Sequence, residues 1–244
     1  MSTRRLAFVA GATGYTGSAT VARLRALDVE TVAHVRPDSQ RLAEWRKRFE
    51  AIAARVDTTS WDATAMHATF RTLRPTHVFA TLGTSLARSK GGSDSSVPDT
   101  YADVDFALTK MLIDASVAAG SVERFVYISA AGANAGTRNP YLKVRVEIER
   151  LIRASGLAFT VARPGFVSGS DREEARPLER ISATASDVFF TLASSLGAAG
   201  FASRYRSISG TQLARGLVRA AFDANCKDRS LHAGDLRRPD VALS

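Results

Sequence analysis

The stretch from Ala7 to Leu24, AFVAGATGYTGSATVARL, decides the fold of this chain. A short apolar run ends at Gly11, and Gly14 and Gly17 follow before a segment with helical periodicity. Glycines between a buried strand and a helix permit a tight turn and let a pyrophosphate approach the backbone. The helix start then supplies free N–H groups and a partial positive charge. The pattern favours a dinucleotide-binding loop over an ordinary glycine-rich turn.

Strand-like runs alternate with helical segments through the first two thirds of the 244-residue chain. The expected strands are 5–10, 31–35, 53–56, 76–82, 124–129 and 157–162, and the expected helices are 18–27, 39–49, 62–72, 100–119 and the segment after Pro140. This alternation implies βαβ units and a parallel sheet. We therefore predict an α/β fold with a doubly wound, mainly parallel Rossmann sheet.

The last third of the sequence is less regular. It predicts helices near 186–199 and 211–222 and a short strand at 231–233. No repeat or linker justifies a second unit, so we expect a single domain over 1–244. Residues 165–244 are expected to contribute a small C-terminal cap on the substrate side.

Charge and composition narrow the function classes. The net charge is +9, but the basic residues are scattered and no zinc-finger or aromatic RNA-binding pattern accompanies them, so no nucleic acid is expected. A basic surface would favour a small anionic ligand. The longest uncharged stretch, 188–203, is shorter than the ~20 residues of a spanning helix, so no transmembrane segment is expected. The four histidines show no metal-ligand spacing.

A single cysteine, Cys226, excludes an intrachain disulfide and suits a reducing compartment. The N-terminus does not read as a signal peptide, and we expect a cytoplasmic protein. A homo-oligomer or a protein partner remains open.

The end of the second expected strand bears on the choice of cofactor. In the segment TVAHVRPDSQRL, Arg36 stands at the strand end and no carboxylate precedes it, while Asp38 follows Pro37. An acidic residue there would bind the ribose 2′-hydroxyl of NAD, whereas an arginine accommodates the 2′-phosphate of NADP. The sequence favours NADP(H), with a surface arginine as the alternative.

These segments give the chain a resemblance to the atypical short-chain dehydrogenase/reductase superfamily. GATGYTG matches the glycine pattern of the extended and atypical branches. ATLGTSLARSKGG, VDFALTK and NPYLKVRVEIERLIRASGLAFTVARPG resemble the Tat-interacting-protein-like branch. That branch includes eukaryotic regulators, reductase-like proteins and fungal relatives at mitochondrial membranes. The resemblance covers about Leu6 to Gly169.

The resemblance implies which residues hold a cofactor. The residues lining the diphosphate would be Gly11, Thr13, Gly14, Tyr15, Thr16 and Gly17. Asp57 would turn toward the adenine, and the ribose would pass Leu82, Gly83 and Thr84. Pro164, within the segment RPG, would lie beside the nicotinamide and the substrate. Ser129 matches the catalytic serine. Asp105 falls where many relatives have a structural asparagine, with a helix-surface role as an equal alternative.

The segment NPYLKVRVEIERL contains a candidate catalytic tyrosine. Asn139 suits an N-cap and Pro140 a first helical position, which places Tyr141 in the first turn. Residues i and i+4 share a helix face, so its partner should be Arg145 and not Lys143. The family pattern is Tyr-x-x-x-Lys, in which lysine bonds the nicotinamide ribose. Arginine keeps the charge but is bulkier and permanently protonated, so cofactor binding should survive better than catalysis.

Two functions follow from this pattern. The first is an NADP(H)-dependent oxidoreductase of the atypical short-chain type acting on a small carbonyl or related compound. Tyr141 would supply the proton with help from Arg145, and Ser129 would hold the carbonyl oxygen. The alternative is an NADP(H)-binding regulatory or scaffold protein with little or no turnover. Nucleic-acid binding ranks below both.

Overall fold

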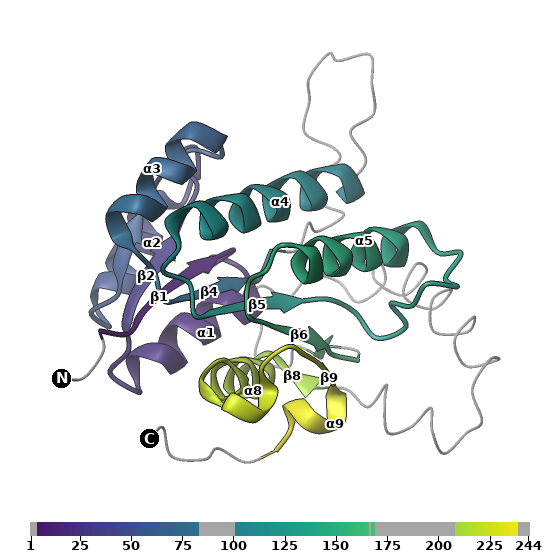
Figure 1. Ribbon diagram of the computed structural model, residues 1–244. Helices are drawn as coiled ribbons and strands as arrows, with labels where there is room; N and C mark the ends of the chain where they lie inside the picture. The colour runs from purple at the N-terminus through teal and green to yellow at the C-terminus, as the bar shows by residue number, and fades with distance from the viewer. Residues whose placement is uncertain (1–3, 83–100, 166, 169–207, 239–244) are drawn as a thin grey trace.

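The computed structural model describes residues 4–82, 101–165, 167–168 and 208–238. Seven parallel strands form the main sheet, in the order β3-β2-β1-β4-β5-β6-β9 (Figure 1). Their bounds are β1 Leu6–Ala10, β2 Glu30–His34, β3 Arg55–Asp57, β4 His77–Ala80, β5 Arg124–Ile128, β6 Phe159–Arg163 and β9 Arg229–His232. The order reverses between β1 and β4, which is the switch point where such sheets bind ligands. The predicted doubly wound Rossmann sheet is confirmed.

Helices cover both faces of the sheet (Figure 1). One face carries α1 Tyr15–Arg25, α2 Leu42–Glu50, α8 Gly210–Phe222 and α9 Ala233–Leu236. The other carries α3 Ala63–Leu73, α4 Tyr101–Ala119 and α5 Pro140–Ala154. Each layer closes its own apolar core against the sheet.

Strand β1 shows why the strands read as continuous apolar runs. All five of its residues are buried. Ala7 and Val9 belong to the core under α1 and α8, while Leu6 and Phe8 belong to the core under α3, α4 and α5. A strand of a parallel sheet covered on both faces must be apolar on both sides.

The observed helix and strand bounds lie close to the predicted ones, with physical reasons for the differences. Helix α1 begins at Tyr15 and not at Ser18, because the extended backbone of Gly14 already serves as its N-cap. A two-stranded parallel pair, β7 Val167–Ser168 with β8 Ile208–Ser209, is too short to give a sequence pattern. The predicted helix over 186–199 lies outside the described residues.

The described C-terminal residues join the main layers. Helix α8 packs against α1. The short strand predicted at 231–233 overlaps β9, which extends the sheet beside β6; its place in the sheet could not be predicted from the sequence. Much of the segment predicted as a substrate-side cap, including 169–207, lies outside the described residues, so the cap and the single-domain boundary stay predictions. Among the described residues, no helix combines the length and apolar character needed to cross a membrane.

Candidate functional site

The three glycines after β1 have different structural roles. Gly11 has φ +79°, and a Cβ there would lie 2.7 Å from the Thr81 carbonyl oxygen. A Cβ at Gly17 would lie 2.1 Å from the Gly11 carbonyl oxygen. These two glycines are therefore required for the turn itself. Gly14 is exposed, and the closest atom to a Cβ there would be the Gly11 oxygen, at 3.3 Å. A bound group has room to approach the backbone at Gly14.

The start of α1 is suited to a diphosphate. Its N-cap is Gly14, which has no side chain that could bond the free amide groups of the first turn. The first turn also contains no acidic residue. The amide groups and dipole of the helix end therefore attract an anion without competition from a nearby carboxylate. Thr13 and Thr16 are half-buried beside this turn. These residues fit the diphosphate of a dinucleotide.

The ring of Tyr15 lies against the start of α8. A Cβ at Gly210 would lie 2.2 Å from Cε1 of Tyr15, so the ring packs against the first residue of α8. Across the switch point, the Thr81 hydroxyl donates to the Ala10 carbonyl oxygen at 2.7 Å. Leu82, which follows, is half-buried against the core of the α3–α5 side. The predicted ribose contacts at 83 and 84 lie outside the described residues.

The ends of β2 and β3 meet at the expected adenine side. The carboxylate of Asp57 accepts hydrogen bonds from the backbone N–H of Thr59 at 3.1 Å and from its hydroxyl at 2.9 Å. His34 is buried below this turn and its Nε2 bonds the Thr59 carbonyl oxygen at 2.8 Å. Burial is the largest effect that lowers the pKa of His34. The side chain of Arg36 is 42% exposed and lies 3.4 Å from Asp38.

The candidate tyrosine stands at the start of α5 as predicted. Asn139 Oδ1 accepts hydrogen bonds from the backbone N–H groups of Tyr141 and Leu142, at 2.9 and 3.3 Å. Tyr141 is 50% exposed. The guanidinium carbon of Arg145 lies 5.0 Å from the centroid of its ring, so the expected i, i+4 pairing is present. Lys143 is exposed.

Arg145 is buried in a network that joins α4, β5 and α5. Its Nη2 lies 3.0 Å from Oδ2 of Asp105, and its Nη1 donates to the Tyr127 hydroxyl at 2.8 Å. Burial tends to lower the pKa of Arg145, but Tyr141, Tyr127 and Asp105 raise it overall, so the guanidinium stays charged. Burial raises the pKa of Tyr127, which stays a neutral phenol. Asp105 is 4% exposed, so its helix-surface alternative is wrong.

Ser129 takes part in a second buried network. Its hydroxyl donates to Oε1 of Glu149 at 2.7 Å. The same carboxylate accepts two hydrogen bonds from Arg163, at 2.9 and 2.6 Å, and one from Arg153 at 3.3 Å. A carboxylate only accepts hydrogen bonds, and a serine hydroxyl has a single proton to donate. The proton of Ser129 is therefore used in the hydrogen bond to Glu149. Pro164 is buried directly after β6.

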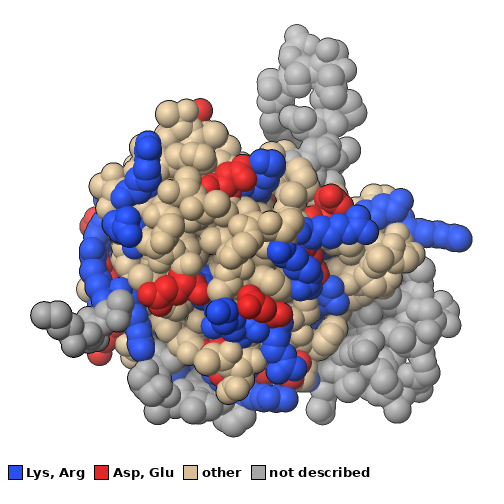
Figure 2. Space-filling model, viewed as in Figure 1, with Lys and Arg blue, Asp and Glu red and all other residues tan. Residues whose placement is uncertain are grey.

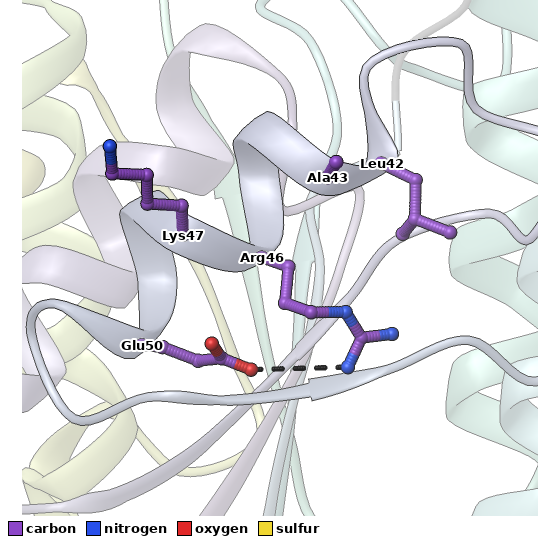
Figure 3. A pocket seen from close by; sticks show the side chains of 5 residues that line it. All are labelled: Leu42, Ala43, Arg46, Lys47 and Glu50. Atoms are coloured by element: carbon purple, nitrogen blue, oxygen red, sulfur yellow. Dashed lines mark ion pairs between the residues drawn. The ribbon is translucent and has the colours of Figure 1, made fainter.

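One hollow of the described surface is formed by α2. A shallow hollow along α2 is lined by Leu42, Ala43, Arg46, Lys47 and Glu50 (Figure 3). Arg46 and Glu50 lie 3.9 Å apart there, and the hollow contains no predicted site residue. On the face drawn in Figure 2, basic and acidic side chains are interleaved.

Two further kinds of reactive group in the described residues are a cysteine thiol and possible metal ligands. Burial raises the pKa of the Cys226 thiol. Within the described ranges, no three histidine, cysteine or acidic side chains gather as metal ligands do.

Comparison with known proteins identifies the family. The family described as NAD(P)H-binding matches residues 11–188. The chain belongs to this family. It therefore contains an NAD(P)H-binding domain, as the glycine loop indicated.

Curated relatives of this NAD(P)H-binding protein come from fungi. It is 30% identical over 174 residues to "Protein fmp52-1, mitochondrial" of Aspergillus terreus, covering 69% of each chain. It is 30% identical over 182 residues to "Protein FMP52, mitochondrial" of Coccidioides immitis, covering 70% of this chain and 69% of the relative. These names point to mitochondria, so the expected cytoplasmic location is wrong.

Solved structures share the fold. The leucoanthocyanidin reductase–NADPH complex from Vitis vinifera has a TM-score of 0.66 at 16% identity, covering 93% of this chain and 68% of that one. The Citrobacter triphenylmethane reductase with NADP(H) has a TM-score of 0.59 at 14% identity, covering 93% and 69%. Both neighbours were crystallised with the cofactor class that the glycine loop predicted.

Sequence reasoning missed Glu149 and Tyr127. Glu149 lies four residues after Arg145 and eight after Tyr141, so helical spacing alone could have placed it on the same face. Tyr127 looked like one more apolar residue of β5, and nothing local distinguishes its hydroxyl. The cofactor and catalytic roles assigned from the sequence stay predictions.

Proposed function

We propose that this protein is an NADPH-dependent oxidoreductase that reduces a small carbonyl or related compound. The observation that carries the proposal is the position of Tyr141. It is half-exposed at the start of α5, lies over the Arg145 cation, and stands at the carboxyl edge of the sheet that also carries the glycine loop.

Each residue would have a distinct task. When bound, NADPH supplies a hydride to the substrate carbon. Gly14 and the start of α1 hold the diphosphate, and Tyr141 gives its phenolic proton to the substrate oxygen. The Ser129 hydroxyl donates its proton to Glu149, so toward a substrate Ser129 would act chiefly as a hydrogen-bond acceptor. This supports Tyr141 as the main donor to a carbonyl oxygen.

The preference for NADPH over NADH rests on Arg36. It follows β2, its side chain is 42% exposed, and its neighbour Asp38 lies beyond Pro37. An exposed arginine at this place can bind a 2′-phosphate through charge-assisted hydrogen bonds.

The second candidate is an NAD(P)H-binding regulatory protein without turnover. It is supported by two residues with expected catalytic roles, Ser129 and Arg145, whose polar groups already bond other residues of the protein. The Ser129 proton goes to Glu149, and Arg145 is paired with Asp105. Neither bond prevents cofactor binding at the glycine loop.

A single set of assays separates the two. NADPH oxidation is followed by absorbance with a panel of aldehydes, ketones and quinones, for wild type and Tyr141→Phe, while cofactor affinity is measured by calorimetry. The oxidoreductase predicts turnover that Tyr141→Phe lowers about a hundredfold or more, since general acid catalysis contributes ~10²–10⁴. Tight NADPH binding with no turnover on any compound supports the regulatory protein.

A further inference from the structure

The contacts of Arg145 assign it a role that differs from binding the cofactor. Its side chain is 5% exposed. Nη2 is paired with Asp105 at 3.0 Å, and Nη1 donates to Tyr127 at 2.8 Å and to the Ile128 carbonyl oxygen at 3.4 Å. Two of the three guanidinium nitrogens are therefore engaged inside the protein. The face of the guanidinium covers the rings of Tyr141 and Tyr127, at 5.0 and 5.7 Å.

Asp105 supplies the charge that keeps this cation in place. It reaches Arg145 from α4, 40 positions away in the sequence, and its own side chain is 6% exposed. A buried arginine without a counter-ion would be strongly disfavoured and would move toward water. Neutral Tyr127 can accept a hydrogen bond but cannot neutralise the charge. The carboxylate therefore decides where the guanidinium lies.

We propose that Asp105 is a positioning residue of the site, which fixes Arg145 under the ring of Tyr141 and so sets the face that Tyr141 presents to NADPH. Arg145 then acts through Tyr141 and is not a ligand of the cofactor. This inference rests on the proposed function, because it takes Tyr141 to lie beside the nicotinamide.

A cation under an aromatic ring restrains the ring as well as attracting it. Half of the surface of Tyr141 is exposed, it lies in the first turn of α5, and its ring contacts Arg145. Without Asp105, Arg145 would leave the ring, and Tyr141 would sample more than one orientation. A bound cofactor would then have to order Tyr141 on binding, which weakens affinity.

The test is a double-mutant cycle on the full chain, with NADPH affinity measured by calorimetry. Asp105→Asn should weaken NADPH binding about three- to tenfold, the range expected for a lost cation–π restraint. In a Tyr141→Ala background the same change should have no further effect, because the ring through which Arg145 acts is gone. Equal losses in both backgrounds would mean that Arg145 contacts the cofactor directly, and would overturn the proposal.

A spectroscopic readout separates positioning from general loosening. In protein labelled with 3-fluorotyrosine, the Tyr141 resonance, assigned by Tyr141→Phe, should shift in Asp105→Asn. The matched control is Asp114→Asn, which breaks an exposed ion pair with Lys110 on the same helix, at 2.6 Å. That control should leave both the resonance and NADPH affinity unchanged. An unmoved resonance in Asp105→Asn refutes the inference.

A second variant covers the case in which Asp105→Asn does not fold. Asp105→Asn with Arg145→Gln replaces the buried ion pair by two neutral amides that can bond each other. It should show the same loss of NADPH affinity, and wild-type affinity in this variant would overturn the proposal. Turnover is measured separately. If NADPH binds but no carbonyl is reduced, the proposed reaction is wrong, and the double-mutant cycle of Asp105 and Tyr141 still decides the role of Asp105.

Discussion

The Ser129 hydroxyl donates a hydrogen bond to the Glu149 carboxylate at 2.7 Å, and this carboxylate also takes a two-pronged contact from Arg163. Glu149 is 3% exposed, and its bonds connect α5 with β6 and with Ser129, the residue directly after β5. Charge-assisted hydrogen bonds are roughly twice as strong as neutral ones. This carboxylate thus fixes two residues at the carboxyl edge of the sheet.

Glu149→Gln should destabilise the protein by about 2–4 kcal/mol, because it leaves Arg163 without a counter-ion and weakens the bond to Ser129. Urea unfolding measures the change. The control is Glu147→Gln on the same helix, whose pair with Arg150 is exposed and should contribute less than about 1 kcal/mol. Similar losses in the two variants would show that the buried network adds nothing.

The glycines of the loop should separate fold from binding. Gly17→Val places a side chain 2.1 Å from the Gly11 oxygen at its first carbon, so it should prevent folding. Gly14→Val adds its side chain where the backbone is exposed, so circular dichroism should stay native while NADPH affinity drops at least about tenfold. If Gly14→Val binds NADPH as wild type does, the loop is only a turn.

The features that could be predicted from the sequence are those that depend on residues close together along the chain. The strand–glycine–helix pattern and the Asn139–Pro140 start of α5 depend on neighbours within one turn, and the structure has both. The pairing of Tyr141 with Arg145 also follows from spacing along one helix. The partner of Arg145 did not follow, because Asp105 lies on another helix and only tertiary packing brings the two charges together. The same holds for Ser129 and Glu149.

The choice between the two nicotinamide cofactors should depend on Arg36. A charge-assisted contact with the 2′-phosphate is worth ~1.5–3 kcal/mol, so wild type should bind NADPH roughly ten- to hundredfold more tightly than NADH. Arg36→Ala should remove this preference and leave NADH affinity nearly unchanged. Calorimetry with both cofactors checks the prediction, and equal wild-type affinities would contradict it. The control is Arg46→Ala on the outer face of α2, which should alter neither affinity.

His77 gives the protein a pH-dependent stability away from the site. It begins β4, its ring lies 4.2 Å from that of Phe222, and its Nδ1 bonds the Thr76 hydroxyl at 2.9 Å. Burial, with Arg124 and Arg5 nearby, lowers the pKa of His77 to about 4, from an ordinary value of 6.5. The folded protein therefore holds His77 neutral at a pH where the unfolded chain protonates it.

The sign of the pH effect follows from proton binding. Between pH 6.5 and about 4 the unfolded state binds more protons at this histidine, so stability falls as pH falls through that window. From pH 7 to pH 5 the loss due to His77 should be about 2 kcal/mol, at 1.36 kcal/mol per pKa unit. His77→Phe keeps a ring beside Phe222 but cannot protonate. Urea unfolding at both pH values should show a loss about 2 kcal/mol smaller in His77→Phe than in wild type, and equal losses would show that His77 is not the group responsible.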